Sequence, residues 1–427
     1  MNKSDVAFLK ALTEAPSPSG YEVPAADIMR KRLTGIADTI ETNVLGSVHA
    51  TLRGTAAKND ETAAAAPSVM IAGHLDEIGM MVKYISDDGF ISFDAIGGVD
   101  AAILPGLRVD VYATGKAAKT DVEADATADA EAEATADAKT DAEADAAVDA
   151  ETEKKADPTP DAEAEKEAKK VNAKADNPKP ELLRGIIGRR PIHLIEAEER
   201  KNVTATDKLF IDVGLDGKEA KKRIRIGDAI TYGVGFEEFG KGFAVARAFD
   251  DKLGVWIAAR VLEEVKKAGG APGDVIAAGT VQEEIGLRGG ITSAYGINPV
   301  IGISAEVGHA TDYPDIDKRK HGEAVCGKGP IIARGPNINP VLFERLVAAA
   351  KKSGSPYQIG PEARATGTDA NAIQLSRGGK VAGLISIPLR YMHTPTEVLK
   401  LKDLEAAVKI LTRFILDLDE NVDFVPR

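Results

Sequence analysis

Short runs of apolar residues alternate along this chain with segments that have the spacing of helices. The run IAGHLDEIGMMV at 71–82 is typical of a buried strand, and it carries His74 and Asp76 two residues apart. Other apolar runs end in, or lead into, acidic or imidazole side chains at Glu283, Glu284, Glu306 and His393. Because open α/β sheets place their sites at the carboxyl ends of strands, we expect these side chains to gather in one site.

Helical spacing is clearest after the doubled aspartate formed by Asp250 and Asp251. Apolar residues recur there on one face of a helix, at Leu253, Trp256, Ile257, Val261, Leu262 and Val265. An amphipathic helix is also expected near the N-terminus, and a closing helix over 401–417. Strands that alternate with helices predict an α/β protein with a three-layer α/β/α fold.

The same patterns divide the chain into domains. The segments 84–115 and 181–232 hold short β-like runs separated by glycine, which predict one small β domain. The α/β domain would then be discontinuous, with a first part at 1–83 and a second part at 233–427. The β domain would occupy 84–232 between them.

A low-complexity segment at 116–180 interrupts the β domain and consists of Ala, Asp, Glu, Thr and Lys with almost no large apolar residue. Its central part, 121–165, has 17 acidic residues and 3 lysines, so its net charge is −14, against −13 for the whole chain. Such a composition cannot bury a core, and we expect a disordered acidic loop. A tolerated surface insertion and an acidic adapter for cationic peptides are both open interpretations.

Composition limits the possible partners. The chain has 427 residues, more than one typical core contains, and its net charge of −13 argues against nucleic acid as a partner. The N-terminal residues contain neither a secretory apolar segment nor a membrane span, so we expect no membrane partner. The single cysteine, Cys326, cannot form an internal disulfide, and we expect a cytoplasmic protein.

The residue types at the strand ends point to a metal site. Imidazole is a common ligand for first-row metals, and Asp76 can accept the other ring N–H of His74 and so fix its tautomer. Two neighbouring carboxylates, as in the doubled aspartate, repel each other unless a cation or proton lies between them. Neighbouring residues on a strand point to opposite faces, so Glu283 and Glu284 should differ in role unless the backbone turns there. The combination predicts a metal-dependent hydrolase.

The chain resembles the tetrahedral aminopeptidases, a family of dinuclear-metal enzymes that includes glutamyl and leucyl aminopeptidases. The resemblance covers nearly all of 1–112 and 181–427. The matching stretches include APSPSGYE at 15–22, GHLDEIG at 73–79, RGIIGRRPIHL at 184–194, FIDVG at 210–214, FDDK at 249–252, QEEIGLRGG at 282–290, GHATDYP at 308–314, TGTDANAIQLSRGG at 366–379 and RYMHTPTEV at 390–398.

This resemblance implies two divalent metal ions per subunit. Asp250 would bridge them, His74 and Glu306 would complete one site, and Glu284 and His393 would complete the other. A site of three carboxylates and two imidazoles suits zinc, cobalt or manganese, and we expect zinc or cobalt.

The resemblance also implies the reaction and the assembly. Glu283 would be the general base that takes a proton from a metal-held water, with Asp76 as a supporting catalytic residue. The substrates would be short peptides with a free N-terminus. The inserted β domain would be a PDZ-like β barrel through which subunits associate, and the family assembles into a hollow tetrahedral dodecamer.

One position departs from the family pattern, which usually has aspartate where this chain has Glu306. In related dinuclear peptidases, aspartate or glutamate at this place goes with different substrate ends. A dinuclear carboxypeptidase or amide deacylase is therefore the alternative function. The third possibility is a non-enzymatic assembly protein in which the metal pocket has only a structural role.

Several other polar residues have simpler expected roles. Arg288 should support a carboxylate, and Asp312 should lie in a loop packed beside the site. Asp369 should either orient His393 and shape the pocket or cap the apolar segment at 372–375. The remaining imidazoles considered, His193, His309 and His321, are interpreted as structural.

Overall fold

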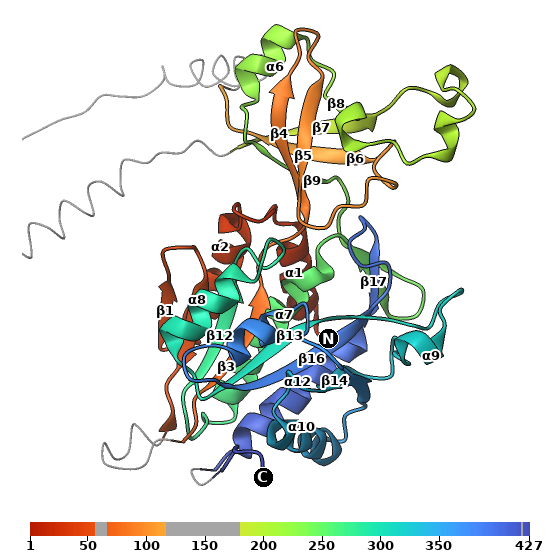
Figure 1. The fold of residues 1–427 in the computed structure, drawn as a ribbon. Helices are drawn as coiled ribbons and strands as arrows, with labels where there is room; N and C mark the ends of the chain where they lie inside the picture. The colour runs from red at the N-terminus through yellow and green to blue at the C-terminus, as the bar shows by residue number, and fades with distance from the viewer. Residues whose placement is uncertain (56–65, 117–179, 420–421) are drawn as a thin grey trace, which may run out of the picture.

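The computed structural model describes residues 1–55, 66–116, 180–419 and 422–427. The expected acidic loop at 116–180 therefore lies, apart from its two end residues, outside the described residues. In the described part, a large α/β body carries a small β barrel at one end (Figure 1).

A mixed sheet of eight strands runs through the α/β body. Its spatial order is β1 (Thr39–Thr42), β2 (Val48–Leu52), β12 (Val275–Thr280), β3 (Val69–His74), β13 (Ile301–His309), β16 (Val381–Leu389), β14 (Ile331–Arg334) and β15 (Gln358–Pro361). The four central strands, from β12 to β16 in this order, run parallel. Their carboxyl ends therefore meet at one edge of the sheet, as the sequence pattern required.

Helices cover both faces of this sheet. One face packs against α1 (Lys3–Glu14), α2 (Val23–Leu33), α7 (Phe249–Lys267), α10 (Pro340–Ser353) and α12 (Leu401–Leu416). The opposite face packs against α8 (Arg288–Ile297) and α11 (Asp369–Gln374), while the short α9 (Lys318–His321) lies in the loop after β13. The predicted mixed α/β class is confirmed. No described helix combines the length and the apolar character that a membrane-spanning helix needs.

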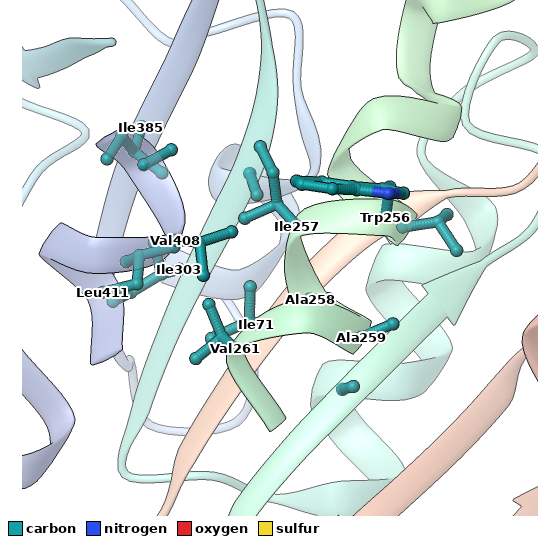
Figure 2. Packing of buried hydrophobic residues seen from close by; sticks show 14 of the residues in the cluster. Ile71, Trp256, Ile257, Ala258, Ala259, Val261, Ile303, Ile385, Val408 and Leu411 are labelled. Carbon is teal, nitrogen blue, oxygen red and sulfur yellow. The ribbon is translucent and has the colours of Figure 1, made fainter. Parts of the chain in front are cut away.

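The largest part of the core lies between α7 and the central strands. Figure 2 shows Trp256, Ile257 and Val261 of α7 packed near Ile71 of β3 and Ile303 of β13. All these side chains are almost fully buried, and the indole N–H of Trp256 donates to the backbone carbonyl of Asp5 at 2.9 Å. Burial of apolar area on both sides of α7 fixes this helix against the sheet.

Two glycines allow α7 to pack closely on the sheet, since Gly73 of β3 lies against Gly254 of α7, and Gly254 lies against Ala305 of β13. A Cβ atom on Gly73 would lie 2.2 Å from the carbonyl carbon of Gly254, and a Cβ on Gly254 would lie 2.1 Å from the carbonyl oxygen of Ala305. Residue 73 directly precedes the predicted ligand His74, and residue 254 lies four positions after Asp250. The close contact therefore brings two predicted ligands together through the main chain.

The small barrel is closed by six strands in the order β4 (Gly79–Ile85), β5 (Ile91–Ile96), β8 (Phe210–Asp212), β7 (Glu181–Gly188), β6 (Arg108–Ala113) and β9 (Ala229–Tyr232). Helix α6 (Gly217–Arg223) packs beside β4, and three short 3-10 turns occupy Ile192–Leu194, Glu199–Lys201 and Thr206–Lys208. The predicted boundary at residue 83 falls inside β4, the first strand of the barrel. The sequence shows one apolar run at 71–82 because β3 and β4 are both rich in apolar residues, and β4 begins only five positions after the end of β3.

A third sheet adjoins the return from the barrel. It contains β10 (Glu237–Phe239), β11 (Phe243–Ala246) and β17 (Glu397–Lys400), all antiparallel. β11 leads directly into α7, and β17 begins at Glu397. The pairing of β11 with β17 therefore brings the chain before Asp250 close to the chain after His393.

We predict that Gly73→Ala lowers the thermal unfolding midpoint, because the added methyl group overpacks the contact between β3 and α7. Overpacking of this kind typically costs roughly 1–3 kcal/mol. Gly296→Ala in α8 is the matched control, since a Cβ atom there meets no atom within 4 Å and alanine favours helix. An unfolding midpoint for Gly73→Ala equal to that of the control would contradict the close contact.

Candidate metal centre

The structure brings all five predicted metal ligands into one cavity. His74 is the last residue of β3, and Asp250 is the second residue of α7. Glu284 follows β12, Glu306 lies within β13, and His393 lies between β16 and β17. Each side chain is thus delivered by a different element at the same edge of the sheet.

Asp250 lies between the two imidazoles. Its Oδ1 is 3.1 Å from Nε2 of His74, and its Oδ2 is 3.3 Å from Nε2 of His393. Nε2 of His393 is also 3.4 Å from Oε2 of Glu284. One carboxylate that faces both rings with different oxygens has the geometry of a ligand shared between two positions.

Two overlapping triplets of described residues hold ligand atoms within 4.8 Å of one another. One is His74, Asp250 and Glu284, and the other is His74, Glu283 and Glu306. Nε2 of His74 lies 3.8 Å from an oxygen of Glu283 and 3.8 Å from an oxygen of Glu306. The first triplet joins residues that the family resemblance assigns to different metals. The second includes Glu283, for which we expected a role in proton transfer.

A turn in the backbone brings both members of the acidic pair to the site. β12 ends at Thr280, and Gln282 has a φ of +57°, in the left-handed region. The alternation of a strand therefore stops before Glu283 and Glu284, and both residues line the cavity. Because the backbone turns here, strand alternation no longer requires Glu283 and Glu284 to differ in role, and their different roles stay a prediction.

The carboxylate of Asp76 holds this turn in place. It accepts hydrogen bonds from the backbone N–H of Glu283 at 3.0 Å, from that of Glu284 at 3.1 Å and from the hydroxyl of Ser19 at 2.7 Å. Although burial opposes ionisation, the His74 ring and the hydrogen bond from Ser19 lower the pKa of Asp76. Nδ1 of His74 is nearer to the backbone oxygen of Asp76, at 3.0 Å, than to its carboxylate, at 3.5 Å. The Asp76 carboxylate therefore mainly holds the backbone of Glu283 and Glu284, and contacts the His74 ring less closely.

Two further buried acids support the ligands through backbone N–H groups, and sequence reasoning gave them no role in the site. Glu397 accepts from the N–H of Asp250 at 3.1 Å and from that of His393 at 2.9 Å. Asp251 accepts from the N–H of His74 at 3.1 Å. Asp251 belongs to the doubled aspartate and Glu397 to the stretch TPTEV at 394–398, and both stretches can be recognised in the sequence. However, no spacing rule distinguishes an acid that faces a cation from one that faces a backbone amide.

A buried ion cluster lies where the chain leaves the α/β body for the barrel. The Nζ of Lys252 is 3.0 Å from Oε1 of Glu77 and donates to the carbonyl of Ala15 at 2.6 Å. Arg247 donates to the other oxygen of Glu77 and to the carbonyl of Glu14. Although burial opposes ionisation of Glu77, Arg247 and Lys252 lower its pKa. This cluster ties together α1, the exit to the barrel and the return before α7.

Charge crowding is the main electrostatic property of the cavity. Burial, opposed by His74 and reinforced by neighbouring carboxylates, raises the pKa of Glu283 to about 8. Burial also raises the pKa of Glu306 well above its usual range. Hydrogen bonds to Asp250 and Glu284 raise the pKa of His393 to about 11. Carboxylates that must hold protons in this way fit divalent cations, which supply positive charge, and imidazole and carboxylate ligands suit such ions.

The structure also shows the contacts of the other polar residues considered in the sequence. Thr368, rather than Asp369, caps α11, while Asp369 accepts a hydrogen bond from the Thr280 hydroxyl at 2.6 Å. Arg288 donates to the side-chain oxygen of Gln282 at 3.3 Å, not to a carboxylate of the described residues. Asp312 lies outside the cavity lining and binds the Arg390 guanidinium through two hydrogen bonds, of 2.8 and 2.7 Å. Two of the imidazoles interpreted as structural, His309 and His321, line the cavity.

The cavity has a volume of about 560 Å³ and extends well beyond the predicted ligands. Its further lining comes from β14, β16, the segment after β15 and the loop that holds α9. A space of this size can take a side chain as well as the reacting group at the acidic cluster.

We predict that Asp76→Asn weakens binding of divalent metal by 10- to 100-fold, the usual effect of losing a partner that positions metal ligands. An amide would place an NH₂ group against backbone N–H donors and would free the turn at Glu283 and Glu284. Calorimetric titration with zinc or cobalt measures the change. Ser19→Ala, which removes one donor and keeps the carboxylate, should weaken metal binding less. Equal losses in the two variants would contradict the role given to the carboxylate.

Comparison with known proteins identifies the family of this chain. The sequence matches the family model of the M42 glutamyl aminopeptidases over residues 54–159 and 166–410. It is 28% identical to a lysyl aminopeptidase of Pyrococcus furiosus, with 99% of each chain covered. It is also 28% identical to a putative aminopeptidase of Acetivibrio thermocellus, with 96% of this chain and 97% of the relative covered.

Solved structures show the same fold. An aminopeptidase of the archaeon Desulfurococcus kamchatkensis is 30% identical, with a TM-score of 0.75 over 98% of this chain and 96% of that one. A TET aminopeptidase from a marine sediment archaeon of the Thaumarchaeota is 26% identical, with a TM-score of 0.76 over 98% of both chains. The family match spans most of the sequence, and the chain belongs to the M42 glutamyl aminopeptidase family of peptidases.

Proposed function

We propose that this M42 aminopeptidase removes N-terminal residues from short peptides with the help of two divalent metal ions. His74 and Glu306 would hold one ion, Glu284 and His393 the other, and Asp250 would be shared. The observation that carries the proposal is the position of Asp250, whose two oxygens face different imidazoles at 3.1 and 3.3 Å.

Glu283 is the proposed general base. It lies in the cavity beside the ligands and is held by the hydrogen bond from its N–H to Asp76. Bound metal ions would polarise the scissile carbonyl and make a water molecule more acidic. Glu283 would take a proton from the attacking water and later give it to the leaving amine.

The buried acids around the ligands would keep this geometry. Asp76 orients the backbone of the acidic pair, and Glu397 holds the N–H groups of Asp250 and His393. Such supporting contacts fix ligand orientation before the substrate arrives. The identity of the metal, zinc or cobalt, and the cytoplasmic location stay predictions from the sequence.

Self-association through the barrel is part of the proposal. On β7, alternation places Leu182, Arg184 and Ile186 on the outer surface of the barrel, where the two apolar side chains are 51% and 44% exposed. Apolar side chains on the outside of a small barrel favour contact with a second surface. We therefore assign the inserted unit at 84–232, extended back to Gly79, as the association domain, and its PDZ-like character stays a prediction.

We predict that metal-loaded protein releases N-terminal residues one at a time from free peptides and leaves N-acetylated copies of the same peptides intact. Glu283→Gln should lower kcat by at least about 10²- to 10⁴-fold, the usual contribution of general acid–base catalysis, while metal content and unfolding temperature stay unchanged. Mass spectrometry of the products over time measures which peptides are cleaved and how fast each protein cleaves them. Cleavage of acetylated peptides, or release from the C-terminus, would favour the deacylase or carboxypeptidase. A metal-loaded protein inert on all peptides would favour the assembly protein.

We predict that the double variant Leu182→Asp, Ile186→Asp lowers the mass of the assembly in solution, because charges would replace the apolar surface of β7. Light scattering coupled to size-exclusion chromatography measures the mass. Val44→Asp, at a fully exposed apolar residue of the α/β body, is the control and should keep the wild-type mass. If the mass of the double variant equals that of the wild type, β7 is not the association surface.

A further inference from the structure

We propose that the cavity selects a cationic N-terminal residue, lysine or arginine, and that the carboxylate of Glu362 pairs with its charged end. This inference rests on the proposed aminopeptidase function and names the substrate class of the same site. It is carried by the position of Glu362, by the charges of the cavity lining and by the apolar side chains between Glu362 and the metal ligands.

Glu362 lies at the far side of the cavity from the ligands. In the sheet, Glu306 of β13 pairs with Ser386 of β16, and Ser386 pairs with Ile331 of β14. β14 pairs in turn with β15, and the N–H of Glu362 continues this ladder by donating to the carbonyl of Arg334 at 2.9 Å. The backbones of Glu306 and Glu362 are thus three strands apart, roughly 14 Å across the sheet, and Arg334 lies a further three residues, roughly 10 Å, along β14 from Ile331.

This separation requires a long substrate side chain. A lysine side chain spans about 6 Å from Cα to Nζ when extended, and the arms of the two glutamates shorten the remaining gap from both ends. A substrate residue held with its amine and carbonyl at the acidic cluster can therefore reach Glu362 only if its side chain is long. Short side chains would leave this part of the cavity to water.

The charge of the lining favours a cation. Among the described residues that line the cavity there is no lysine and no arginine. Glu362 is half-buried, and in the described part of the chain no lysine or arginine forms an ion pair with it. Burial raises its pKa, opposed by His309. A partly buried carboxylate without a cationic partner gains from pairing with one, and a charged hydrogen bond is stronger than a neutral one.

Glu323, the other carboxylate of this part of the lining, is a poorer candidate. Its side chain is 57% exposed and already pairs with Lys318 at 2.8 Å. Exposed ion pairs contribute little, and a substrate would have to compete with Lys318 for the carboxylate. Glu362 is therefore the residue that the structure assigns to the substrate cation.

Several apolar side chains line the cavity between the ligands and Glu362, beside the hydroxyl of Ser386. Ile331 and Ala333 of β14 and Leu384 of β16 line this part, and Met392 lies next to His393. The methylene groups of lysine or arginine can lie along these apolar side chains while the charged end reaches the carboxylate. An acidic N-terminal residue would instead bring a second negative charge towards Glu362, although the family model carries the name glutamyl aminopeptidase.

The test compares kcat/KM for lysyl, norleucyl and glutamyl p-nitroanilides with metal-loaded protein. Norleucine has the aliphatic stem of lysine without the ammonium group. We expect the lysyl substrate to exceed the norleucyl one by about tenfold, between the effects of exposed and buried charged hydrogen bonds. Glu362→Gln should reduce this ratio to about one, and Glu362→Lys should favour the glutamyl substrate. Glu344→Gln, at an exposed residue of α10, is the control and should keep the wild-type ratio.

Binding of the free amino acids separates this inference from the proposed function. Calorimetry should show tighter binding of L-lysine than of L-norleucine to metal-loaded wild type and equal binding to Glu362→Gln. Equal binding to the wild type overturns the inference whether or not peptides are cleaved. Cleavage that prefers norleucyl or glutamyl substrates also overturns it and leaves the aminopeptidase function intact. Selective binding of lysine without any cleavage keeps Glu362 as the cation site and refutes the function.

Discussion

Repulsion among buried carboxylates is the constraint on which the rest of the structure depends. Four parallel strands end at one edge of the sheet, and Asp250, Glu283, Glu284 and Glu306 are all directed into one cavity there. Buried charges are tolerated only with partners. The imidazoles of His74 and His393 supply part of the positive charge, and divalent ions fit the remainder.

The buried acids that surround the proposed ligands also need groups that stabilise their negative charge. Asp76, Asp251 and Glu397 each face backbone N–H groups of residues that carry the ligands. These contacts stabilise negative charge with fixed dipoles and at the same time hold the main chain of the ligands. At the junction with the barrel, the buried ion cluster of Glu77, Arg247 and Lys252 also holds the main chain, where the chain leaves the α/β body and returns to it. Buried charge therefore connects the segments that leave the α/β body for the barrel and return from it.

The sequence predicts the class of the fold and the membership of the site better than it predicts the contacts. Apolar runs that end in His74, Glu284 and Glu306 locate residues that the structure gathers in one cavity, because strand ends are visible as a pattern and parallel strands share an edge. The same rule could not identify Glu397 or Asp251, since their partners are backbone amides that leave no mark in the sequence. The start of the barrel at Gly79 is not visible in the sequence, because β3 and β4 form one apolar run. Glu362 gives no signal either, because its importance comes from a cavity formed by strands far apart in the chain.

The glycine contact between β3 and α7 has a consequence for how this enzyme can vary. Gly73 lies directly against the main chain of Gly254, and Gly254 lies against that of Ala305, so main-chain contact sets the distance between the backbones that carry His74 and Asp250. A substitution at either glycine cannot adjust this distance gradually; it can only push the helix and the strand apart. The adjustable dimensions of the centre are therefore the lengths of its outer side chains. Glu306, one methylene longer than the aspartate that the family resemblance leads us to expect, is a change of the kind that this close packing permits.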